Sequence, residues 1–129
     1  MDDLRRVNPT AAVSLLCHSY GTVTCAYAAR NLPIADLVLY GSPGVGVARA
    51  ADLATPARVW AAVAGNDWIR HVPFHRVAGL GFGTDPVSAR FGARVFPAGD
   101  GGHSDYHRPG GQSLHSLAMI VLGEQWGTD

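Results

Sequence analysis

The chain has 129 residues, of which ten are basic, ten are acidic and 47% are hydrophobic, so its formal net charge is zero. This balance excludes both the broad positive surface that nucleic-acid binding requires and a polybasic membrane patch. The apolar content excludes disorder, and the length fits a single domain over residues 1–129. No apolar run approaches the ~18 residues of a membrane span, and no signal peptide is visible, so we expect a cytoplasmic protein.

Short apolar runs alternate with helical patterns along the chain. In chain order, the sequence predicts a strand at residues 11–17, a helix at 20–30, a strand at 36–40, a short helix at 48–54, strands at 58–64 and 93–98, and a helix at 112–124. Continuous apolar runs without alternation are typical of strands that are buried on both faces of a parallel sheet. The order therefore predicts an α/β fold, a three-layer sandwich around a parallel sheet.

The turn between the first strand and the first helix has the sequence CHSYG, residues 17–21. A small residue, any residue, Ser, any residue and Gly between a buried strand and a helix is typical of a nucleophile elbow. Such a turn strains the backbone of the serine and calls for small residues two positions to either side. Gly21 fits this pattern, whereas Cys17 stands where glycine is usual. The alternative is that Ser19 only caps the helix.

Two further residues with side chains suited to catalysis follow predicted strands. Asp67 comes after the third strand and His103 after the fourth, and functional residues of parallel sheets lie at these carboxyl ends. The order Ser, acid, His is that of α/β-hydrolases. Serine becomes a nucleophile when histidine takes its proton, and the acid orients the imidazole. We therefore predict a triad of Ser19, Asp67 and His103, with Asp85 as the alternative acid, although an Asp before Pro more often caps a turn.

Several strings together resemble an α/β-hydrolase family that is common in actinobacteria and has no settled function. They are LCHSYGT at 16–22, LYGSPGVG at 39–46, FGA at 91–93 and GHSDY at 102–106. The usual family strings are GHSYGS, GSPGVGV and GH-S-x-Y. The resemblance covers about residues 11–123 and implies the same roles, with Ser19 as nucleophile, Asp67 as acid and His103 as base.

The resemblance also implies elements that the sequence does not contain. A whole α/β-hydrolase has strands before its nucleophile strand, so we expect an N-terminally truncated domain. The N–H of Tyr20 would supply one oxyanion-hole donor, and the other would come from a loop after an earlier strand. The loss of one donor costs ~100–1,000-fold in turnover. The strand at 11–17 would then have an open apolar edge, which predicts self-association.

Other polar residues give weaker signals. His71 and His75 are four apart, as are His103 and His107, but neither pair lies on a predicted helix that could align both rings, so we expect no metal site. The loop around Ser42 is not a phosphate-binding loop. It matches neither the G-x-G-x-x-G pattern nor the P-loop pattern, and the chain has no lysine.

Four residues near the predicted site remain. We expect His18 and Ser42 to line the substrate site, although His18 could pack beneath the sheet end and Ser42 could serve only the turn. The two cysteines, Cys17 and Cys25, lack C-x-x-C spacing, and we expect them to be buried thiols.

The sequence thus predicts a serine hydrolase that acts on an ester or related small acyl substrate without a cofactor or metal. Aromatic residues between Trp68 and Phe91 are candidates for an apolar acyl pocket. The alternative is a weak or inactive hydrolase fragment that serves as a binding or structural module.

Overall fold

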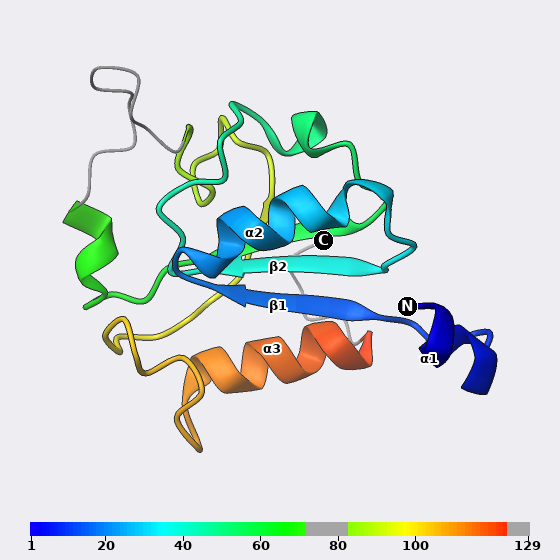
Figure 1. The fold of residues 1–129 in the computed structure, drawn as a ribbon. Coiled ribbons are helices and arrows are strands. Elements are labelled where there is room, and N and C mark those ends of the chain that lie inside the picture. Colours follow the sequence, from blue (N-terminus) through cyan, green and yellow to red (C-terminus); the bar gives the residue numbers. More distant parts are fainter. Residues whose placement is uncertain (72–82, 124–129) are drawn as a thin grey trace.

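The structure, a computed structural model, describes residues 1–71 and 83–123 (Figure 1). A parallel sheet has the order β1-β2-β3-β4, formed by Ser14–His18, Asp36–Tyr40, Arg58–Ala62 and Arg94–Val95. The α-helices are α1 at Asp2–Val7, α2 at Gly21–Ala28 and α3 at Gln112–Leu122. Because α2 and α3 lie on opposite faces of the sheet (Figure 1), the predicted three-layer α/β architecture is confirmed.

Strand β2 shows why an uninterrupted apolar run forms a central strand. All five of its residues are buried, and successive side chains of a strand point to opposite faces. Leu37 and Leu39 pack in the cluster that contains Ala26 of α2, while Val38 and Tyr40 pack in the cluster formed with α3. Both faces therefore need apolar side chains, so the alternating pattern of a half-exposed strand is absent.

Most predicted elements lie at the expected positions, with shorter bounds. The predicted strand at 93–98 is reduced to Arg94–Val95, although the Phe96 N–H still donates to Ala61 O at 3.1 Å. The predicted helix at 48–54 is only a 3₁₀ turn at Ala50–Leu53. Two other 3₁₀ turns, Ala29–Asn31 after α2 and Trp68–His71 after β3, flank the elements that carry the candidate site.

Helix α1 was not expected from the sequence. None of its residues is buried, so its sequence lacks the apolar stripe by which amphipathic helices are recognised. Its charges nevertheless favour a helix, because acids occupy the first turn and arginines the last, which complements the helix dipole.

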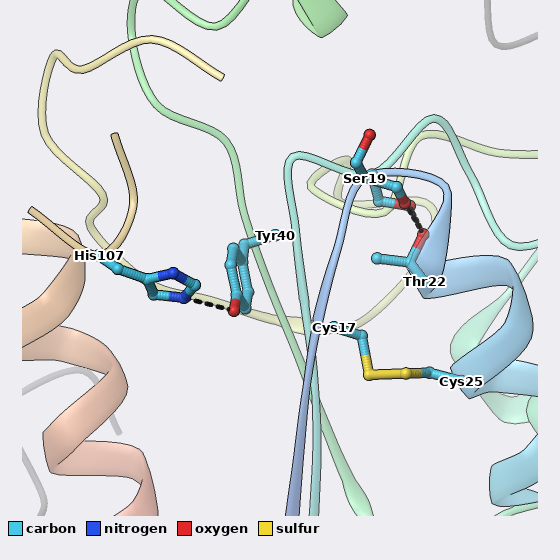
Figure 2. The surroundings of a disulfide bond; sticks show 7 residues. Cys17, Ser19, Thr22, Cys25, Tyr40 and His107 are labelled. Atoms are coloured by element: carbon cyan, nitrogen blue, oxygen red, sulfur yellow. Dashed lines mark hydrogen bonds between the residues drawn. A yellow bond between two sulfur atoms is a disulfide. The ribbon is translucent and has the colours of Figure 1, made fainter. Parts of the chain in front are cut away.

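The two cysteines form a disulfide, so the prediction of buried thiols is wrong. Cys17 of β1 and Cys25 of α2 have Cα atoms 6.3 Å apart (Figure 2), because α2 folds back along β1 after the turn. For a sequence separation of eight residues, closing the loop adds about 2–3 kcal/mol to the free energy of unfolding. The cytoplasmic location stays a prediction, and a chain kept reduced there would carry both residues as thiols.

Strand β1 has one open edge in the described part of the chain. It pairs with β2 alone, and its Leu16 side chain is 42% exposed. The Val13 C=O and the Ser19 N–H both bond towards β2. Because backbone groups alternate in direction along a strand, the N–H and C=O of Leu16 point to the open edge. This edge is apolar and uncharged, which favours pairing with a second chain.

We expect the 129-residue chain to self-associate through β1. Leu16→Lys should convert dimers or larger species to monomer, because a charge on an edge strand opposes strand pairing. Size-exclusion chromatography with light scattering measures this. Tyr27→Lys is the matched control, since it places the same charge on an exposed apolar residue of α2. A wild-type chain that runs as a monodisperse monomer would contradict the prediction.

Candidate active site

Ser19 lies on the turn between β1 and α2 with an unusual backbone. Its φ is 60°, in the left-handed region that residues other than glycine rarely adopt and that stores strain. A directed series of hydrogen bonds holds this backbone. The Gly44 N–H donates to the Ser42 hydroxyl at 3.0 Å, and Ser42 and Thr22 hydroxyls are 2.7 Å apart. Thr22 donates to Ser19 O at 2.6 Å (Figure 2), so Thr22 must accept its bond from Ser42.

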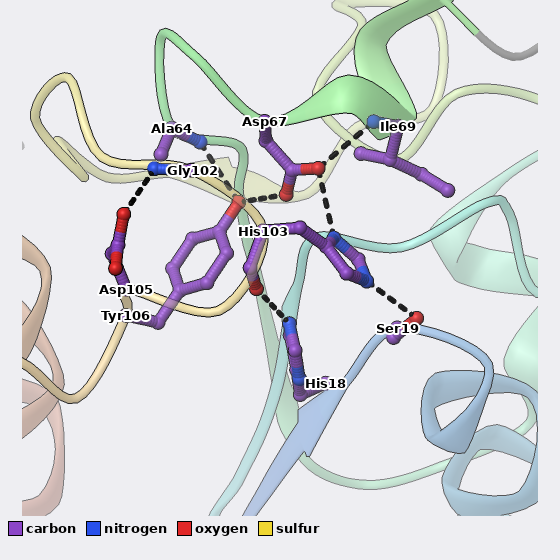
Figure 3. A network of polar contacts seen from close by, with 9 residues as sticks. All are labelled: His18, Ser19, Ala64, Asp67, Ile69, Gly102, His103, Asp105 and Tyr106. Carbon is purple, nitrogen blue, oxygen red and sulfur yellow. Dashed lines mark hydrogen bonds and ion pairs between the residues drawn. The ribbon is translucent and has the colours of Figure 1, made fainter.

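The structure brings Ser19, His103 and Asp67 together. His103 Nε2 lies 2.8 Å from Ser19 Oγ, and His103 Nδ1 lies 2.8 Å from Asp67 Oδ1 (Figure 3). The three residues come from loops after β1, β3 and β4, which end at the same edge of a parallel sheet. The Asp67 side chain is fully buried, whereas that of His103 is 13% exposed.

The hydrogen bonds define the direction in which a proton can move. A carboxylate oxygen accepts, so the proton of a neutral His103 lies on Nδ1, towards Asp67. Nε2 then has a free lone pair that can accept the Ser19 hydroxyl proton. This arrangement of nucleophile, base and orienting acid suits acyl transfer.

The buried Asp67 carboxylate has two further donors. The Ile69 N–H donates to Oδ1 at 2.8 Å, and the Tyr106 hydroxyl donates to Oδ2 at 2.6 Å (Figure 3). Gly41 passes directly beside this group with φ at 60°, and a Cβ there would lie 3.0 Å from Oδ2. Glycine is therefore required at this position both by conformation and by close approach.

His18 supports the loop that carries His103. Its Nε2 lies 2.7 Å from His103 O, and because a carbonyl only accepts, Nε2 donates. The His18 ring also lies 4.6 Å from the His103 ring and 5.3 Å from that of Tyr106. Burial lowers the pKa of His18, although its bond to the His103 carbonyl opposes this. His18 therefore lies against the rings of His103 and Tyr106, and its contact with substrate stays a prediction.

Ser42 and the alternative acid Asp85 line the same cavity. This cavity of about 120 Å³ is bounded by Ser42, Ala62, Val63, Arg70, Asp85, Pro86 and Val87. The Asp85 carboxylate accepts the Val87 N–H at 3.1 Å, which is the turn-capping role expected of an Asp before Pro. Ser42 thus lies in a cavity wall, but its hydroxyl is engaged with Thr22 and Gly44.

The small positions on either side of Ser19, and two hydrogen-bonding residues of the site, differ from what the sequence predicted. A Cβ at Gly21 would meet no atom within 4 Å, so crowding does not demand glycine there. At the other position that calls for a small residue, two before Ser19, Cys17 is accommodated through its disulfide bond to Cys25. The roles of Thr22 and Tyr106 were missed, although the GHSDY string already placed a tyrosine three residues after His103.

Two other side chains close to the site, His107 and Asp105, have partners of their own. His107 bonds to the Tyr40 hydroxyl at 2.7 Å (Figure 2), and Asp105 accepts the Gly102 N–H and pairs with Arg108. Within residues 1–71 and 83–123, no cluster of three or more His, Cys, Asp or Glu side chains could hold a metal ion. His75 lies outside the described residues. In the same described part, no helix is long and apolar enough to span a bilayer.

The parallel sheet with helices on both faces (Figure 1) places the chain in the α/β class, which includes the α/β-hydrolase-like fold. A family model described as alpha/beta hydrolase matches residues 1–77, and the chain belongs to this family. It is similar to two uncharacterized Mycobacterium tuberculosis proteins, MT2140 of strain CDC 1551 / Oshkosh and Rv2079 of strain ATCC 25618 / H37Rv. Each is 33% identical over an alignment 139 positions long, and this alignment covers 86% of this chain.

The chain spans about a fifth of the length of these curated relatives, since the matched region covers 21% of each. No solved structure matches the chain significantly.

Proposed function

We propose that the chain is a serine hydrolase that cleaves an ester or a related small acyl substrate. The observation that carries this proposal is the continuous hydrogen-bonded series from Ser19 through His103 to Asp67, with both distances at 2.8 Å. Membership of an alpha/beta hydrolase family supports it, as does the strained backbone of Ser19.

In the proposed reaction, Ser19 Oγ attacks the substrate carbonyl carbon while its proton passes to His103 Nε2. The oxyanion formed at the carbonyl oxygen is stabilised by the Tyr20 N–H, which follows the nucleophile at the start of α2. His103 then protonates the leaving alcohol, and the C–O bond breaks to leave an acyl group on Ser19. Water activated by His103 releases the acid and restores the enzyme. None of these steps requires a cofactor or a metal.

One described side chain, Trp68, bears on the choice of substrate. Trp68 lies against the triad, with its ring 4.6 Å from that of His103, and about half of its surface is exposed. An apolar surface beside the nucleophile favours an apolar acyl group. Phe91, another candidate for this pocket, is buried in the hydrophobic core, and Phe74 and Phe82 lie outside the described residues.

A fluorophosphonate probe tests the proposal, because it reacts only with an activated serine. We expect covalent labelling of the wild-type protein and none of Ser19→Ala. Ser14→Ala is the matched control, since Ser14 begins β1, at the opposite end of the strand that Ser19 follows, and it should label like the wild type. Equal labelling of Ser19→Ala would refute the role of Ser19. A wild-type protein that is never labelled would favour the inactive binding module.

A further inference from the structure

We propose that Tyr106 is a positioning residue for this reaction, because its hydroxyl holds Asp67 and moderates the negative charge that Asp67 presents to His103. This inference rests on the proposed function. It assigns a role to a side chain that touches neither the nucleophile nor the base and acts only through the acid.

The direction of the Tyr106 hydroxyl is fixed by two bonds. Its oxygen accepts the Ala64 N–H at 2.9 Å, and its proton is donated to Asp67 Oδ2 at 2.6 Å (Figure 3). A hydroxyl has a single proton, so occupation of the acceptor side by a backbone N–H leaves the proton directed at the carboxylate.

The ring that carries this hydroxyl is held on several sides. Tyr106 is 2% exposed, and its ring lies 5.3 Å from that of His18 and 5.2 Å from that of Tyr40. Its backbone carbonyl accepts the Ser113 hydroxyl at 2.7 Å, which ties the loop to α3. The hydroxyl therefore cannot move away without disturbing the packing.

The two oxygens of Asp67 have different partners. Oδ1 is shared between His103 Nδ1 and the Ile69 N–H, whereas among the described residues Oδ2 accepts from Tyr106 alone. Asp67 is 1% exposed, so bulk water cannot replace a lost donor. Without the Tyr106 hydroxyl, the carboxylate would keep, among the described residues, only the two donors on Oδ1, His103 Nδ1 and the Ile69 N–H.

The hydroxyl remains a donor across the working pH range. Burial raises the pKa of Tyr106, and its hydrogen bond to Asp67 raises it further. The donated bond spreads the negative charge of Asp67 over a second partner, which weakens the attraction of the carboxylate for a protonated His103. His103 must be unprotonated to accept the Ser19 proton, so loss of this bond should change the pH dependence of the reaction.

The test is the pH dependence of fluorophosphonate labelling in Tyr106→Phe, which keeps the ring and removes only the hydroxyl. We expect the rate at the optimum to fall about 10- to 100-fold, the factor for one hydrogen bond to a charged group. We also expect the acidic limb of the profile to move to higher pH by about half a unit or more. Tyr106→3-fluorotyrosine strengthens the donor and should move the limb the opposite way.

Tyr40→Phe is the matched control, because it removes a buried hydroxyl of the same ring cluster that bonds to His107 instead of Asp67. Its acidic limb should coincide with that of the wild type. If Tyr106→Phe also leaves the limb in place, its role is only structural and the inference fails. Should Tyr106→Phe not fold, an unmoved limb in the fluorotyrosine variant overturns the inference. Absence of wild-type labelling instead overturns the proposed function, and the inference with it.

Discussion

Asp67→Asn is expected to lower the turnover of an ester such as p-nitrophenyl acetate by about 10⁴-fold, the loss seen when the acid of a serine triad becomes an amide. The asparagine fits the same buried space beside Gly41, and its carbonyl can still accept bonds. Its NH₂ group, however, can donate to His103 Nδ1 and thereby stabilise the tautomer with the proton on Nε2. That tautomer cannot accept a proton from Ser19.

The control is Asp85→Asn, the same substitution at the other candidate acid. The Asp85 Oδ1 accepts the Val87 N–H in its own turn, and an asparagine oxygen can make the same bond. Its effect on turnover should therefore be far smaller than that of Asp67→Asn. Comparable losses in both variants, or a loss confined to Asp85→Asn, would contradict the assignment of the orienting acid to Asp67.

The proximity of the three residues of the proposed triad could be predicted because it depends on a general property of parallel sheets. Strand runs such as residues 36–40 are recognisable from their continuous apolar sequence, and their carboxyl ends meet at one edge. Once Ser19, Asp67 and His103 had been placed after separate strands, their proximity followed from topology alone. The two 2.8 Å hydrogen bonds depend on loop conformations, which the sequence did not specify.

Other contacts could not be predicted because they depend on distances between elements. The Cys17–Cys25 bond requires α2 to lie back along β1 at a separation that spacing does not reveal. The contact of Tyr106 with Asp67 joins positions 39 residues apart, and no local pattern marks it. Helix α1 was missed for a different reason, since it buries no residue and so carries no apolar periodicity.

The proposed triad also predicts how losses of turnover combine when two of its members are removed. Ser19→Ala and His103→Ala should each lower turnover by about 10⁶-fold, as for a serine and histidine that act as one unit. The double variant should lose no more than either single variant. Without the base, the Ser19 hydroxyl is not activated, and without the hydroxyl, His103 has no proton to accept.

This non-additivity is measured by a double-mutant cycle on ester turnover. His107→Ala is the control for loss of a histidine near the site, because His107 bonds to the Tyr40 hydroxyl and has no contact with Ser19. His107→Ala should retain most of the activity. Its small fold-loss of turnover should multiply with the fold-loss caused by Ser19→Ala. If the losses from Ser19→Ala and His103→Ala multiplied instead, the two side chains would act independently, and the 2.8 Å contact between them would not be the path of the proton.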